Sequence, residues 1–148
     1  MERKTLAAWP ALIPALVALT LSACAATPPR TATLWDALGR DAGTGRVIDG
    51  TLRRAHDDPA IADLFADTDD AYLKARLLEQ ICAATGGGCT YTGLPMDEAH
   101  SGMAITPAEF GRFVAHLAAA MDEAGVPPDT QSKLIALLAP MQPEIVGQ

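Results

Sequence analysis

A single histidine follows a glycine-rich stretch in the second half of the chain. His100 lies in the segment LPMDEAHSGMAIT, residues 94–106, just before a threonine that can cap a helix. A neutral imidazole is a common metal ligand. A lone histidine beside a turn is more often solvated or hydrogen-bonded locally, so both interpretations stay open at this point. For His56 and His116, at the end of a helix and within one, we expect surface or hydrogen-bonded core positions.

The first of three cysteines ends an apolar stretch near the start of the chain. Residues 6–21 are apolar after a positively charged start, and LSAC at 21–24 closes the run. This resembles a bacterial lipobox, in which Cys24 is lipidated after cleavage before it. An uncleaved membrane anchor is the alternative, which the length barely permits and Pro10 and Pro14 disfavour.

A lipobox implies a definite organisation of the chain. Residues 1–23 would be a lipoprotein signal peptide, 24–33 a tether from lipidated Cys24, and 34–148 the folded domain. The protein would then face the periplasm from the cell envelope, attached to the membrane through the lipid. By resemblance to lipoprotein sorting rules, Ala25 favours the outer membrane over the inner one.

The two remaining cysteines form an even pair in a chain that we expect to be exported. A disulfide between Cys82 and Cys89 is therefore reasonable. Two separate thiols are the alternative. The six residues between the cysteines exclude a CxxC redox or zinc motif.

Charge argues against a nucleic-acid partner. Of the 18 acidic and 11 basic side chains, Glu2, Arg3 and Lys4 belong to residues 1–23, which leaves 17 acidic and 9 basic ones and a net charge of −8. Such a surface repels a phosphate backbone.

Apolar residues recur three and four apart from residue 34 onward, and alternation over five or more residues is absent. This pattern predicts an all-α fold. Gly86 to Ile105 should form a long irregular loop, which is uncommon in a compact domain unless it is organised around something. The predicted helical segments are Leu34–Leu38, then Arg46–Asp57 after a loop with Gly43 and Gly45, a turn at Pro59–Phe65, Thr68–Ala84, Thr106–Glu123 opened by a capping box, and Asp129–Leu138.

Six short motifs, in this order and spacing, resemble the group I truncated haemoglobins. They are LWDALG at 34–39, DDPAIADLF at 57–65, the double glycine at 86–87, YTGLPM at 91–96, AHSGMAIT at 99–106 and AGVP at 124–127. The resemblance covers about residues 34–146. It implies a two-over-two helical sandwich around haem b, with His100 as the proximal ligand of the iron.

The resemblance also implies a set of side chains around the haem. Phe65 would stack on it, Leu73 and Leu77 would cover the distal side, and Tyr91, Lys74 and Arg76 would reach its propionates. The residues expected on the proximal side are Met96 and Phe110, with Val114 and Ile105 behind them.

The expected distal wall departs from the family pattern because it lacks polar groups. Leu52 stands where a tyrosine is usual, Thr51 where a phenylalanine is common, and Leu77 where a glutamine is frequent. Dioxygen gains partial negative charge when it binds, and each donor to it would contribute about 1.5 to 3 kcal/mol. We therefore expect faster dioxygen release and relative favour for carbon monoxide and nitric oxide. Gln80, one turn further along, is a candidate substitute donor.

Three functions remain open from the sequence. The first is a lipid-anchored globin that binds oxygen, nitric oxide or carbon monoxide at the iron. The second is a haem enzyme, either a nitric oxide dioxygenase with an unknown reductase partner or a peroxidase-like protein, for which a distal acid or base is not evident. The third is a haem-free structural lipoprotein of globin fold.

Overall fold

The computed structural model describes residues 31–148, which form one compact unit. The expected signal peptide and Cys24 lie outside these residues. The described part contains helices and turns and has no strand, so the predicted all-α class is confirmed. None of its helices is both long enough and apolar enough to cross a bilayer.

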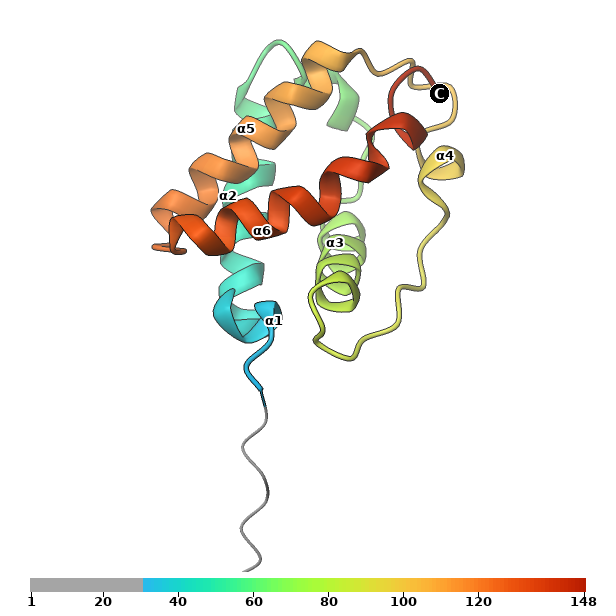
Figure 1. The fold of residues 1–148 in the computed structure, drawn as a ribbon. Coiled ribbons are helices and arrows are strands. Elements are labelled where there is room, and N and C mark those ends of the chain that lie inside the picture. The colour runs from blue at the N-terminus through green and yellow to red at the C-terminus, as the bar shows by residue number, and fades with distance from the viewer. Residues whose placement is uncertain (1–30) are drawn as a thin grey trace, which may run out of the picture. The chain divides into compact units, whose positions relative to one another are not determined.

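Six α-helices and two 3₁₀ segments make up the described part of the chain (Figure 1). In chain order they are α1 (Leu34–Ala37), α2 (Arg40–Asp57), η1 (Ala62–Phe65), α3 (Asp70–Ala84), α4 (Met96–Ala99), α5 (Pro107–Glu123), α6 (Pro128–Leu138) and η2 (Ala139–Glu144).

The predicted capping box at the start of α5 is confirmed. The Thr106 hydroxyl accepts the Glu109 backbone N–H, and the Glu109 carboxylate accepts the Thr106 backbone N–H at 2.8 Å, which is a complete capping box. Pro107 occupies the first helical position, where its missing N–H costs nothing. The start of α3 was placed slightly too early, because Asp69 and not Thr68 is its cap and accepts the backbone N–H of Ala71 at 3.0 Å.

The predicted loop before the second helix is wrong. Helix α2 already begins at Arg40, so Gly43 and Gly45 lie inside it and are buried. A Cβ on Gly43 would overlap the carbonyl oxygen of Leu38, so the glycine lets α1 and α2 approach closely. The glycines serve helix packing here and do not break the helix.

The long loop after α3 is less irregular than predicted. It contains the one-turn helix α4, whose backbone ends at His100. The chain also closes with η2, a 3₁₀ segment that the sequence pattern did not reveal and that Pro140 and Pro143 keep from being a regular α-helix.

Helix α2 is the centre of the packing. It packs against α3 and α5, while α6 packs against α5 and α1. The core between them contains Trp35, Val47, Ile48, Met121 and Leu134, each at most 4% exposed. Helix α4 packs against η2, at the far end of the long loop that Figure 1 shows between α3 and α4.

Candidate haem site

The His100 imidazole is oriented by the backbone of its own helix. Its Nδ1 lies 2.7 Å from the carbonyl oxygen of Met96, one turn earlier in α4. A carbonyl can only accept, so Nδ1 carries the proton and a neutral ring has its lone pair on Nε2. Within residues 31–148, Nε2 has no hydrogen-bond partner, and the side chain is half-buried. This is the arrangement in which a histidine can ligate a metal ion.

Several apolar side chains on α3, α4, α5 and η2 are half-buried. The backbone of α3 packs mainly against α2 and that of α4 against η2, and the Gln80 side chain of α3 reaches Met96 of α4. The half-buried apolar residues on these elements and on α5 are Leu73, Leu77, Met96, Phe110, Phe113, Val114 and Met141. One free imidazole nitrogen within a largely apolar surround fits the chemistry of haem b, which needs one axial ligand and apolar walls.

A small cavity of about 40 Å³ lies among α2, α3, α5 and α6. Leu77 and Thr51 line it, together with Ile48, Gln80, Ile81, Phe113, Leu117 and Leu138. The distal role expected for Leu77 stays a prediction. The Thr51 hydroxyl donates to the Val47 carbonyl at 2.8 Å, so its one proton is already used. The cavity can hold one small molecule, and its lining favours an apolar one.

Leu52 does not line this cavity. It is 5% exposed, belongs to the buried core and is not among the residues that line the cavity. Thr51, its neighbour in α2, reaches the cavity instead.

Gln80 bridges α3 to two other elements. Its amide nitrogen donates to the sulfur of Met96 at 3.4 Å and to the sulfur of Met141, in η2, at 3.3 Å. The amide is therefore already engaged with thioether sulfurs from α4 and η2. Met141 was missed by the sequence analysis because nothing in the pattern predicts that η2 returns to this place.

Phe65 is held by two aromatic neighbours. It stacks on Phe113 with ring centroids 5.8 Å apart and meets the edge of His56 at 5.9 Å. His56 also lies 2.9 Å from the Asp70 carboxylate. His56 is thus an exposed, hydrogen-bonded residue, as predicted.

The three residues expected at the haem propionates have other partners. The Lys74 ammonium lies 2.7 Å from Asp49, and Arg76 pairs with Glu79 at 2.7 Å. The Tyr91 hydroxyl donates to the Leu94 carbonyl at 3.0 Å, and burial raises its pKa. In the described part of the chain, these three side chains therefore do not form a binding site for a further anion.

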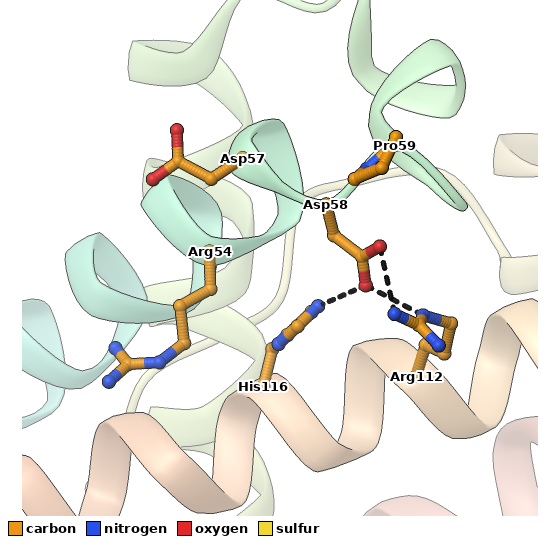
Figure 2. A pocket seen from close by; sticks show the side chains of 6 residues that line it. All are labelled: Arg54, Asp57, Asp58, Pro59, Arg112 and His116. Carbon is orange, nitrogen blue, oxygen red and sulfur yellow. Dashed lines mark hydrogen bonds and ion pairs between the residues drawn. The ribbon is translucent and has the colours of Figure 1, made fainter.

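Asp58 is the centre of an ion cluster that the sequence analysis did not predict (Figure 2). Its carboxylate accepts two N–H groups of Arg112, at 2.6 and 2.9 Å, and Nε2 of His116 at 2.8 Å. Its side chain is only 6% exposed. The sequence feature that could have indicated this cluster is the spacing of Arg112 and His116, which lie four apart on one face of α5. His116 is therefore a hydrogen-bonded position, as predicted.

The cluster fixes the connection between α2 and η1. Asp58 caps α2 and also accepts the Ala60 backbone N–H at 3.1 Å. Because α5 also presents Phe113, the same helix holds both the Asp58 turn and the Phe65 ring. The hydrogen bond from Arg112 is the largest cause that holds the pKa of Asp58 well below its usual range.

This cluster predicts acid sensitivity. A carboxylate whose pKa is lowered by folding stabilises the protein above its unfolded pKa of about 3.9, and that contribution is lost as the pH falls below this value towards the folded pKa. Asp58→Asn should lower the Tm at pH 7 by roughly 5 °C. It should also flatten the fall in Tm between neutral and acidic pH, because the titrating group is gone. Thermal unfolding followed by circular dichroism measures both effects, and an unchanged pH profile would contradict the role of Asp58. Asp129→Asn, at an exposed position of α6, is the matched control.

Comparison with known proteins agrees with this fold. Residues 33–146 match the Bacterial-like globin family. Group 1 truncated hemoglobin GlbN of Mycolicibacterium paratuberculosis is 36% identical over 114 residues, which cover 77% of this chain and 84% of that protein. The chain therefore belongs to the bacterial-like globin family.

Solved structures share the fold. The truncated hemoglobin of Tetrahymena pyriformis in its Fe(III) form has a TM-score of 0.75 at 21% identity, over 79% of this chain and 100% of that one. The hemoglobin of Chloroflexus aurantiacus has a TM-score of 0.68 at 26% identity, over 79% of this chain and 99% of that one. The predicted truncated-globin fold is thus confirmed.

Proposed function

We propose that this globin binds haem b through His100 and takes a diatomic gas on the iron. The observation that supports this most directly is the His100 ring, whose Nδ1 is occupied by Met96 and whose Nε2 has no partner in residues 31–148. His100 would hold haem b, and the haem would supply an iron that can bind oxygen, nitric oxide or carbon monoxide.

Side chains of this chain would hold the porphyrin on both faces. Phe65, fixed by Phe113, offers an aromatic surface, and Leu73 and Leu77 offer apolar cover from α3. Met96, Phe110 and Val114 provide apolar groups on the side of His100. Burial of the apolar porphyrin against these groups would contribute most of the affinity.

The pocket favours binding over catalysis. Thr51 and Gln80, the polar side chains that line the cavity, already donate to a carbonyl and to sulfur atoms. Peroxidase chemistry would need an acid or base beside the gas position, and the cavity lining supplies neither. A gas-binding role is therefore the better match for this set of residues.

The test is a titration of the purified protein with hemin, followed by the Soret absorption band. The decisive comparison is with His100→Ala, which removes the imidazole. A folded protein that gives no Soret band would contradict the proposal.

We also propose that the globin is anchored to the envelope through lipidated Cys24, facing the periplasm, with the outer membrane favoured. The support is the LSAC sequence at residues 21–24 and the proline-containing stretch that follows it. In cell fractions, the wild type should sediment with membranes, and Cys24→Ser should not be processed as a lipoprotein. Equal fractionation and equal processing of the two would contradict lipid anchoring.

A further inference from the structure

One stripe of α3 fastens the loop that leads to His100. Arg76, Glu79 and Cys82 are spaced three apart along the helix, so they share a face. All three contact residues of the loop between α3 and α4. The loop is therefore attached to α3 at two places, one covalent and one polar.

The covalent attachment is a disulfide between Cys82 and Cys89, whose Cα atoms lie 5.6 Å apart. The two cysteines differ sharply in accessibility. Cys82 is 1% exposed inside the core, whereas Cys89 is an exposed residue of the loop. A reductant can therefore reach this bond from the side of Cys89 only.

The polar attachment lies three residues beyond Cys89. The Glu79 carboxylate accepts the Thr92 backbone N–H at 3.1 Å and the Thr92 hydroxyl at 2.9 Å. Arg76 binds the same carboxylate at 2.7 Å and also donates to the Thr92 hydroxyl. These three residues, which we call the Thr92 clamp, hold the loop just before it enters α4.

We propose that the Cys82–Cys89 disulfide is a reversible redox site for a dithiol protein of the envelope, and that its state sets how firmly the loop holds α4 and His100. The effect on haem and the location of the partner in the envelope rest on the proposed function, whereas the exchange of this disulfide with a dithiol does not.

The exchange balances without any further reactant. A thiolate of the dithiol attacks the sulfur of Cys89, the Cys82–Cys89 bond breaks, and the Cys82 sulfur leaves as a thiolate that takes a proton. The second thiol of the partner then attacks the partner's own sulfur in the mixed disulfide and releases Cys89, which also takes a proton. The partner loses two electrons and two protons, and this protein gains them.

Reduction should loosen the loop without freeing it. The Thr92 clamp remains, but the disulfide no longer keeps the loop close to α3, so the effective concentration of Thr92 at Glu79 falls. The backbone from Thr92 runs directly into α4, where Met96 orients His100. A looser loop therefore lets α4 open more often. The two attachments should also support each other, so the loss of one already weakens the other, and losing both should cost less than the two single losses combined.

Trp35 provides an internal reporter of the disulfide. A Cβ on Gly87 would overlap the Cys82 sulfur and lie 2.8 Å from the Trp35 ring, so ring and sulfur meet at this glycine. Trp35 is buried, and it is the only tryptophan in residues 24–148. Disulfides quench indole fluorescence, so reduction should brighten Trp35.

The first experiment follows reduction of the haem-free protein, residues 24–148, by dithiothreitol, using Trp35 fluorescence and thiol counting. The proposal expects reduction at a rate that low urea concentrations leave unchanged, and reoxidation by a small disulfide. Reduction only as fast as global unfolding would overturn it, because the bond would then be purely structural. Cys89→Ser is the control and should show no fluorescence response.

The second experiment tests coupling to His100 without haem. Hydrogen exchange of the Ala99 and His100 amides, which donate to Pro95 and Met96, should be faster in Cys89→Ser than in the wild type. Amides in the middle of α5 should be unchanged. Equal exchange at Ala99 and His100 would overturn the coupling.

The third experiment measures haem loss to an acceptor protein for the wild type, Cys89→Ser, Glu79→Ala and the double variant. We expect roughly fivefold faster loss from Cys89→Ser, within the range that closing a short loop provides. The double variant should lose haem more slowly than the product of the single effects predicts, because each single variant already weakens the remaining attachment. Glu144→Ala, at an exposed position of η2, should match the wild type. Simple multiplication of the single effects would overturn the mutual support of the two attachments. A wild type that binds no hemin would contradict the proposed function, while the first two experiments would still decide the redox site.

Discussion

Replacing His100 with alanine should remove the normal Soret spectrum and weaken hemin binding by roughly 100-fold. The imidazole is the only nitrogen ligand that α4 presents, and its Nε2 is free because Nδ1 donates to Met96. Without it, the porphyrin would keep only apolar contacts. Circular dichroism should show the same helix content as the wild type, since His100 follows the last residue of α4 and lies outside the buried core.

Two controls make this result specific. His56→Ala removes an exposed imidazole that is bonded to Asp70, so it should leave the hemin spectrum unchanged. Free imidazole added to His100→Ala should enter the vacated space and restore a spectrum close to that of the wild type. Wild-type hemin affinity in His100→Ala would show that the iron, if bound, has another ligand.

Local signals in the sequence predicted the parts of the fold that depend on neighbouring residues. The capping box at Thr106 and Glu109 is complete within four residues, so it could be recognised without knowing the fold. The orientation of His100 is likewise a contact within one turn of its own helix. The class of the fold therefore followed from short-range patterns, whereas the role of His100 was implied by the resemblance to the group I truncated haemoglobins and stays a prediction.

The errors arose where a residue's role depends on a distant partner. Glycine is common in loops, so Gly43 was predicted to lie in one. In the structure, the Leu38 carbonyl occupies the space that any side chain at position 43 would need. Asp58 directly follows the end of α2, but its pairing with Arg112 bridges 54 positions of sequence and was not predicted. Gln80 likewise meets Met141 across 61 positions. Spacing along one helix cannot reveal such contacts, because they depend on how the helices pack.

Those distant contacts also change the expected behaviour of the gas site. Gln80 was a candidate donor to a bound gas, yet its amide is shared between two sulfur atoms. Thr51 lines the cavity with a hydroxyl that already donates to Val47. The cavity lining thus offers fewer free donors than the residue types alone suggested.

Introducing a donor should therefore slow dioxygen release. In Leu77→Gln, the new amide would line the cavity from α3, where Leu77 now presents only methyl groups. A donor to partially charged dioxygen contributes about 1.5 to 3 kcal/mol. If the whole gain appears in the dissociation rate, release from the reduced, haem-loaded protein should become roughly 10- to 100-fold slower. Carbon monoxide gains less charge, so its release should change much less.

The matched control for this change is Leu77→Met, which keeps an apolar chain of similar length. It should leave dioxygen release close to that of the wild type, because volume and polarity are nearly unchanged. Stopped-flow displacement of dioxygen by carbon monoxide measures the rate for all three proteins. Equal rates for Leu77→Gln and Leu77→Met would mean that position 77 does not face the gas. A wild-type rate already as slow as that of Leu77→Gln would instead show that Gln80 leaves the sulfur atoms and serves as the donor once haem is bound.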